Sequence, residues 1–242
     1  MWPGGRVPED GDDAVIPPEW KVLLDISTAN LAFHIKGDLI VNETGRSITA
    51  ERIWVQGQLI AGSEDQRLTD FKINLTGGRN SPSLVLGEFL DVSNKAIGVT
   101  GNLTLYGRLI NIVGTRLVAP ALAGDNIIKV AEDVSSDWRV GDEILLLPTQ
   151  RTPREYETRV ITEINGQLIT LDRSLSYFHW GSESVVTTPY GDLDMRGEVV
   201  HLTRSIEIEG TREDNWGRRV YVTQIYNQEL KTYFKRRVIM DG

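Results

Sequence analysis

A five-residue pattern, in which the first and third residues are mostly apolar and the last is glycine, returns along the chain at a nearly constant spacing. Phe-His-Ile-Lys-Gly at 33–37 is followed twenty residues later by Ile-Trp-Val-Gln-Gly at 53–57, and after twenty more by Ile-Asn-Leu-Thr-Gly at 73–77. A fourth copy, Ile-Gly-Val-Thr-Gly at 97–101, comes after twenty-four residues. This alternation buries one face of a strand, so the pattern predicts one short strand in each period.

Short strands at such a period, with little helical periodicity between them, are typical of an all-β solenoid whose coils stack about 4.8 Å apart. Two inward ladders are expected, Phe33, Ile53, Ile73, Ile97 and Ile35, Val55, Leu75, Val99. The residues between them form an outward row, His34, Trp54, Asn74 and Gly98. A glycine ends each copy, at Gly37, Gly57, Gly77 and Gly101. Glycine is expected at the corners of the coils, where φ is positive or where neighbouring backbones crowd.

The composition is that of a globular chain with a sizeable core. It has 242 residues, 40% hydrophobic, and no cysteine. A net charge of −8 argues against nucleic acid as a partner, because that affinity comes from clustered Lys and Arg. We interpret the basic cluster near the end as solvated charge; it comprises Lys235, Arg236, Arg237, Arg218 and Arg219. No run approaches about 18 consecutive apolar residues, so no transmembrane segment is expected within the chain.

Residues 121–180 interrupt the repeat. Segments 159–164 and 167–171 flank Asn165-Gly166, which supplies the two positive φ angles of a type I′ turn, so a β-hairpin is predicted. We therefore expect solenoid coils at 1–120, a hairpin module inserted in or packed on them at 121–180, and continuing coils at 181–242. The last strand pattern runs to Gly242 without a polar cap, which predicts that the chain is part of a longer protein.

Several blocks resemble one known family. They are Trp-Pro-Gly-Gly-Arg-Val-Pro at 2–8, Gly-Asp-Asp-Ala-Val-Ile-Pro at 11–17, Trp-Arg-Val-Gly-Asp-Glu-Ile at 138–144, and shorter matches at 22–25, 59–64, 194–199 and 202–206. Their order and spacing are similar to those of the eight-glycine (G8) domain of polyductin/fibrocystin-type surface proteins and cell-migration-inducing hyaluronan-binding proteins. The resemblance implies an extracellular, carbohydrate-associated setting and a right-handed parallel β-helix that continues beyond this chain.

One block departs from the hyaluronan-degrading branch of that family. Where the resemblance implies a Ser/Thr-Asp-Tyr block soon after the Gly-Asp strand, this sequence has Thr149-Gln150-Arg151. An amide neither donates an acidic proton nor acts as a carboxylate base, so Gln150 does not replace a catalytic aspartate. The departure argues against inherited activity.

Acidic residues two apart on a strand are the candidates for catalysis. Glycoside cleavage needs two carboxylates about 5 to 9.5 Å apart, and residues i and i+2 of a strand share a face at a similar separation. Asp192 with Asp194 satisfies this spacing, and so does Glu207 with Glu209. We carry Asp192 and Asp194 as catalytic candidates lining a polysaccharide cleft. The alternative is solvated charge, since 34 acidic residues produce such pairs readily.

An outward tryptophan is the candidate for sugar binding. Buried neighbours at Ile53 and Val55 force Trp54 outward, and sugars dock on exposed aromatic faces. His34 and Asn74 are expected to flank Trp54 in the adjacent coils. The alternative is that an insertion or a neighbouring domain covers Trp54. The aromatic group at 177–180 is interpreted as packing between the hairpin module and the solenoid.

Modification is expected at three Asn-x-Thr sequons, Asn42, Asn74 and Asn102. Metal binding has little support, because His34, His179 and His201 have no ligand spacing. The acidic run at 9–13 lacks the spacing of a calcium loop, so we expect no cofactor, with calcium left open.

Taken together, these features predict a non-catalytic extracellular scaffold or matrix-glycan-binding module of a larger cell-surface or secreted protein. The expected partner is an extracellular polysaccharide or matrix protein, and adhesion through an exposed sheet is a further class. The alternative function is a hyaluronan- or polysaccharide-cleaving glycosidase with part of its active site outside this chain.

Overall fold

The structure, a computed structural model, describes residues 6–87, 90–182, 186–211, 217–223, 226–227, 232–233 and 237–241. These residues form strands, turns and loops without any helix, which confirms an all-β chain, and none of them forms a helix able to span a membrane. Two compact units divide the chain: unit 1 is Met1–Leu109 with Arg204–Gly242, and unit 2 is Ile110–Thr203. Residues 2–5, Lys235, Arg236 and Gly242 lie outside the described residues.

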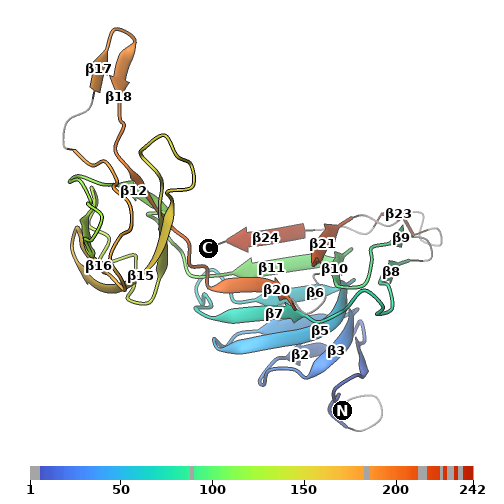
Figure 1. Cartoon of the computed structure of the whole chain (residues 1–242). Helices are drawn as coiled ribbons and strands as arrows, with labels where there is room; N and C mark the ends of the chain where they lie inside the picture. The colour runs from blue at the N-terminus through green and yellow to red at the C-terminus, as the bar shows by residue number, and fades with distance from the viewer. Residues whose placement is uncertain are drawn as a thin grey trace. The chain divides into compact units, whose positions relative to one another are not determined.

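Two sheets of parallel strands build unit 1 (Figure 1). One has the order β2 (Lys21–Leu23), β4 (Asp38–Val41), β6 (Gln58–Ala61), β11 (Asn102–Tyr106) and β24 (Arg237–Asp241). The other has the order β1 (Asp13–Ile16), β3 (Asn30–Ile35), β5 (Arg46–Val55), β10 (Ala96–Val99) and β21 (Arg219–Val222), with β7 (Phe71–Leu75) on β5 and β20 (Ile206–Gly210) on β7. From β1 to β6 the chain alternates between the two sheets.

Glycine turns link strands of the two sheets. Gly37 lies between β3 and β4, Gly57 between β5 and β6, and Gly101 between β10 and β11. A Cβ at Gly57 would lie 2.2 Å from the carbonyl oxygen of Gly37, and one at Gly101 would lie 2.1 Å from that of Gly57. None of the three has a positive φ, so crowding of stacked backbones is the reason for glycine here. Gly77 lies elsewhere, beside carbonyl oxygens of non-glycine residues.

Three of the four repeat copies lie in the predicted register. Phe33 pairs with Ile53, and Ile53 pairs with Ile97 on the next strand. The second ladder has the same order, through Ile35, Val55 and Val99.

The third copy, at 73–77, lies in a different register from the predicted one. Ile73 pairs with Ile48, and Leu75 pairs with Ala50. The reason is the length of β5, whose first half pairs with β7 while its last three residues pair with β10. Asn74 consequently lies beside Thr49 rather than beside Trp54, and the predicted outward row lacks it.

Both sheets of unit 1 contribute to one hydrophobic core. Ile35, Val55 and Val99 of the seven-stranded sheet are fully buried in it, together with Leu39 and Leu59 of the five-stranded sheet. Burying each such side chain stabilises the fold by about 1.5–3 kcal/mol. The alternating pattern of the repeat therefore sets which face of each strand points inward.

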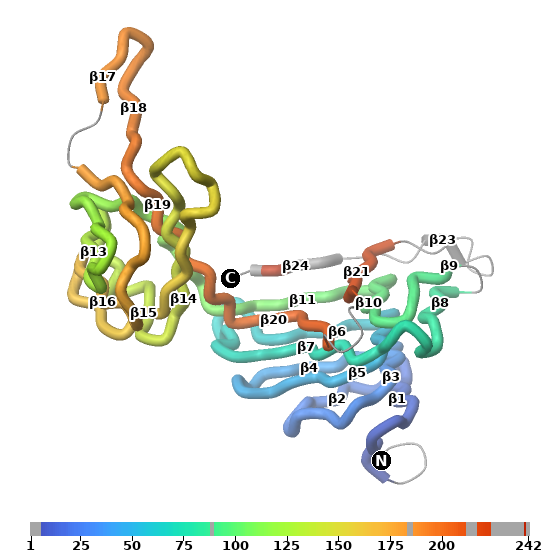
Figure 2. The backbone as a smooth tube through the Cα atoms, viewed as in Figure 1, coloured from blue at the N-terminus to red at the C-terminus, as the bar shows by residue number. Residues whose placement is uncertain are grey.

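Unit 2 is built on an antiparallel sheet (Figure 2). Its order is β12 (Gly114–Arg116), β19 (Glu198–His201), β14 (Glu143–Leu146), β15 (Glu157–Asn165), β16 (Leu168–Leu171) and β13 (Ile127–Lys129). A separate hairpin of β17 (Val186–Thr188) and β18 (Gly191–Leu193) precedes β19. Two more small hairpins belong to unit 1, β8 (Val85–Leu86) with β9 (Leu90–Asp91) and β22 (Tyr226–Asn227) with β23 (Thr232–Tyr233).

The hairpin predicted around Asn165-Gly166 is confirmed as β15–β16, but its turn differs from the predicted one. Asn165 pairs with Leu168, so the two loop residues are Gly166 and Gln167. Only Gly166 has a positive φ, of 60°. A positive φ at the first loop position alone indicates a type II′ turn, because type I′ requires positive values at both positions.

Candidate functional site

Trp54 and His34 lie side by side on β5 and β3, on the face of the sheet that points away from the core. Their rings stack with centroids 4.2 Å apart and planes 6° from parallel. The Trp54 Nε1–H donates to Thr100 Oγ1 at 3.0 Å, and His34 Nε2 lies 3.0 Å from Gln56 Oε1. Each ring therefore covers one face of the other.

A cluster from the β8–β9 hairpin packs against Trp54. It includes Leu84, Leu86 and Val92. Gly98, which pairs with Trp54 across β10 and β5, leaves room for this cluster, because a Cβ there would lie 2.5 Å from Leu86 Cδ2. Sugar stacking needs an open ring face, so these contacts favour the interpretation in which an insertion covers Trp54.

The three sequon asparagines are half-buried residues of unit 1. Asn42 follows β4, Asn74 lies within β7, and Asn102 begins β11, where it pairs with Gln58. Glycosylation at these positions stays a prediction.

The aspartates predicted as a catalytic pair have different surroundings. Asp192 is exposed in β18 and accepts a hydrogen bond from Thr187 Oγ1 at 2.9 Å. Asp194 follows β18 and lines a cavity, whereas Asp192 does not line it. In the second pair, Glu207 binds Lys72 with Oε2 and Nζ 3.0 Å apart, and Glu209 is exposed.

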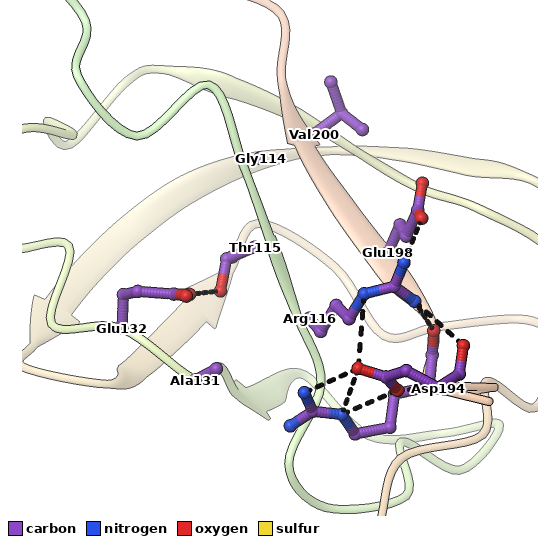
Figure 3. Close-up of a pocket in the computed structure, with 9 residues that line it drawn as sticks. Gly114, Thr115, Arg116, Ala131, Glu132, Asp194, Glu198 and Val200 are labelled. Atoms are coloured by element: carbon purple, nitrogen blue, oxygen red, sulfur yellow. Dashed lines mark hydrogen bonds and ion pairs between the residues drawn. The ribbon is translucent and has the colours of Figure 1, made fainter. Parts of the chain in front are cut away.

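The cavity that Asp194 lines belongs to unit 2 and has a volume of about 510 Å³ (Figure 3). Residues of β12, of β19 and of the segments beside them form its wall. Six polar side chains line it, Thr115, Arg116, Glu132, Asp194, Arg196 and Glu198.

Ion pairs connect the polar side chains of this wall (Figure 3). Arg196 and Asp194 form a fork, with Nε 2.9 Å from Oδ1 and Nη2 2.7 Å from Oδ2. Arg116 donates to Glu198 Oε1 at 2.6 Å and to the Arg196 carbonyl oxygen at 2.9 Å. The Thr115 hydroxyl donates to Glu132 Oε2. Arg116 thus ties β12 to the chain segment between β18 and β19.

This network fixes the charge of Asp194. The hydrogen bond from Arg196 is the main cause that lowers the pKa of Asp194, from 3.8 to about 2, and the charges of Arg196 and Arg116 add to it. A carboxyl group with this pKa is ionised at neutral pH, whereas glycoside cleavage needs one carboxyl group held protonated. Asp194 therefore suits a permanent acceptor and not a general acid.

A buried carboxylate lies behind the aromatic group at 177–180. Glu157 accepts hydrogen bonds from the backbone N–H groups of Ser176 and Tyr177 and pairs with Arg159, while His179 Nε2 lies 3.2 Å from its Oε1. Burial alone would raise the pKa of Glu157, but these partners lower it. The histidine of this aromatic group is therefore part of the packing of unit 2.

The block at 138–144 also has a structural role in unit 2. The Trp138 Nε1–H donates to the carbonyl oxygen of Ile112 at 2.7 Å. Asp142 Oδ2 accepts from the backbone N–H of Arg139 at 2.8 Å and lies 2.9 Å from His201 Nε2. The block therefore closes a turn and links it to β19.

The acidic run at 9–13 stabilises local backbone and side-chain contacts. Asp12 Oδ2 accepts from the Glu9 backbone N–H at 2.8 Å and Asp12 Oδ1 from Arg6 at 3.0 Å, while Asp10 accepts from the Asn30 N–H at 3.0 Å. Across the described part of the chain, no three His, Asp or Glu side chains gather as a metal site.

Sequence reasoning missed most of the cavity wall. Arg116 meets Glu198 because β12 and β19 pair antiparallel, and no short-range spacing indicates that pairing. The alternation of Asp194, Arg196 and Glu198 was the one local signal, because it predicts three charged side chains on one face of an extended segment.

Comparison with known proteins extends the earlier resemblance. Residues 1–118 match the model of the G8 domain. The chain is 34% identical to fibrocystin-L of Mus musculus and 33% identical to fibrocystin of Canis lupus familiaris, with 90% and 86% of the chain aligned but 5% of each relative. A G8 domain-containing protein of Dictyostelium discoideum is 25% identical over 85% of the chain and 18% of its own length.

These matches cover most of both units, and the chain spans only a small part of each relative. The beginning of the chain, where the parallel repeat lies, is the part that matches the family model. Residues 1–118 therefore match the G8 domain, and the chain is similar to fibrocystin-like and other G8 domain-containing proteins.

Proposed function

We propose that this chain is a non-catalytic module of a larger cell-surface or secreted protein, in which it acts as a scaffold or binds matrix glycan. The small share of each relative that it spans supports a role as one module among others. The three sequons and the resemblance to surface proteins support an extracellular setting. The observation that carries the non-catalytic part is the ion-pair fork from Arg196, which engages both carboxylate oxygens of Asp194 and, by keeping this group ionised, removes it as a general acid.

We further propose that the parallel strands of unit 1 continue as a right-handed parallel β-helix. Its support is the register shared by β3, β5 and β10, together with the row of Gly37, Gly57 and Gly101. In the sequence, unit 2 is then an insertion between two strands of this β-helix, β11 and β20.

The cavity of unit 2 is the proposed glycan site. Carboxylates and guanidinium groups both line it, so it offers acceptors and donors to a hydroxylated ligand. Their mutual pairing holds these side chains in place before a ligand arrives, which lowers the entropic cost of binding.

Retention of the whole chain on a glycan array tests this function. We expect binding without cleavage, reduced in Glu198→Gln, which keeps the side-chain shape and removes one charge. Arg173→Gln, an exposed arginine of the same unit outside the cavity, is the matched control and is expected to bind as the unchanged chain does. Loss of viscosity of high-molecular-weight hyaluronan on incubation with the chain would instead favour the glycosidase.

A further inference from the structure

The cavity wall carries hydrogen-bonding groups that the described residues leave unused. Arg196 engages Asp194 through Nε and Nη2, and its Nη1 has no protein partner in the described part of the chain. Of the two carboxylate oxygens of Glu198, Arg116 engages only Oε1, and of those of Glu132, Thr115 engages only Oε2. One donor group and two carboxylate oxygens are therefore left for a ligand.

The charge of the cavity is not balanced. Two arginines face three carboxylates: Arg116 pairs with Glu198 and Asp194, and Arg196 pairs with Asp194. The surrounding unit adds to this excess, because residues 110–203 contain 14 Asp and Glu against eight Lys and Arg. A ligand with its own negative charge is repelled over distances of about 8 Å at physiological salt.

We infer that the cavity accepts a neutral, hydroxyl-rich sugar residue in preference to an acidic one; this rests on the proposed glycan binding. A hydroxyl group both donates and accepts, so neighbouring hydroxyls can donate to Glu132 and Glu198 and accept from Arg196. A uronate or sulfate group only accepts hydrogen bonds, and the carboxylates of the cavity would repel its negative charge. An ammonium group only donates, and it would lie beside two guanidinium groups.

Calorimetric titration of the whole chain with defined hexasaccharides tests this preference. Laminarihexaose and maltohexaose are the neutral probes, and hexasaccharides of hyaluronan and heparin are the acidic ones. We expect a neutral probe to bind at least about tenfold more tightly than either acidic probe, with a difference that grows as salt is lowered. Glu132→Gln and Glu198→Gln are each expected to weaken neutral binding about tenfold. Glu163→Gln, an exposed residue of the same unit, is expected to leave it unchanged.

Each outcome separates the two proposals. Tighter binding of an acidic hexasaccharide overturns the preference and leaves glycan binding standing. Failure of every hexasaccharide to bind overturns the proposed glycan binding together with the preference, and leaves the scaffold role. The neutral probes could also bind Glu132→Gln and Glu198→Gln as tightly as the unchanged chain, in samples whose circular dichroism spectra match it. That result would place the sugar elsewhere and overturn the assignment of this cavity.

Discussion

Gly98 and Trp54 are paired across β10 and β5, and the side chain that Gly98 lacks is replaced by Leu86 of the neighbouring hairpin. A Cβ at Gly98 would lie 2.5 Å from Leu86 Cδ2 and 3.1 Å from Leu84 Cδ2. The glycine therefore decides whether the hairpin can close over the indole ring.

Gly98→Ala is expected to push this cluster away from Trp54 at a modest cost of about 1–2 kcal/mol in unfolding free energy, because the clash is with side-chain ends. In NMR spectra of a ¹⁵N-tryptophan sample, the Trp54 indole signal, assigned through Trp54→Phe, should shift among the six tryptophan signals. Gly217→Ala, where a Cβ meets nothing within 4 Å, is the control. An unmoved Trp54 signal in Gly98→Ala would contradict this role of the glycine.

Gly57→Ala is expected to cost more than Gly98→Ala. Its Cβ would lie 2.2 Å from the Gly37 carbonyl oxygen and 2.3 Å from that of Lys36, and backbone cannot move aside as a leucine side chain can. We expect a loss of about 3 kcal/mol, measured by urea titration. A loss no greater than that of Gly98→Ala would show that the backbones at this corner are not crowded.

The pKa of Asp194 should be about 2 when its carboxyl carbon is titrated by NMR. Because this pKa is below its ordinary value of 3.8, the contribution to stability is complete above pH 3.8 and is lost as the pH falls toward 2. Asp194→Asn should therefore destabilise unit 2 at pH 5 and matter little at pH 2. A pKa near 4 in the folded chain would refute the ion-pair fork.

Glu157→Gln should destabilise unit 2 by about 3 kcal/mol or more, because it leaves the buried guanidinium of Arg159 without a carboxylate. Glu163→Gln, an exposed change on the same strand, should alter the free energy of unfolding by less than about 0.5 kcal/mol. Equal effects of the two substitutions in urea titration would argue against a buried pair.

The strands of the repeat could be predicted from the sequence because alternation alone decides which face is buried. Phe33, Ile53 and Ile97 follow that rule and pair in the predicted register. Ile73 also has a buried face, but its partner is set by how far β5 extends, and the five-residue pattern carries no information about that length.

The candidate site depended on contacts that are distant in the sequence. Asp194 stood out as one of a pair with Asp192, yet its partners are Arg196 and, across β12 and β19, Arg116. The spacing of two carboxylates gives their separation along a strand, whereas their protonation depends on neighbours that only the folded sheet brings close.

The parallel register of the repeated strands can be tested most directly with engineered disulfides, since the chain has no cysteine. Ile40 on β4 pairs with Ile60 on β6, and neighbouring strands lie about 4.8 Å apart, within the range that a disulfide spans. Ile40→Cys with Ile60→Cys should oxidise to an intramolecular disulfide, read by mass spectrometry of the folded chain. Ile40→Cys with Leu59→Cys, whose side chains point to opposite faces, should stay reduced. The reverse result, or no disulfide in either pair, would contradict the stacked register.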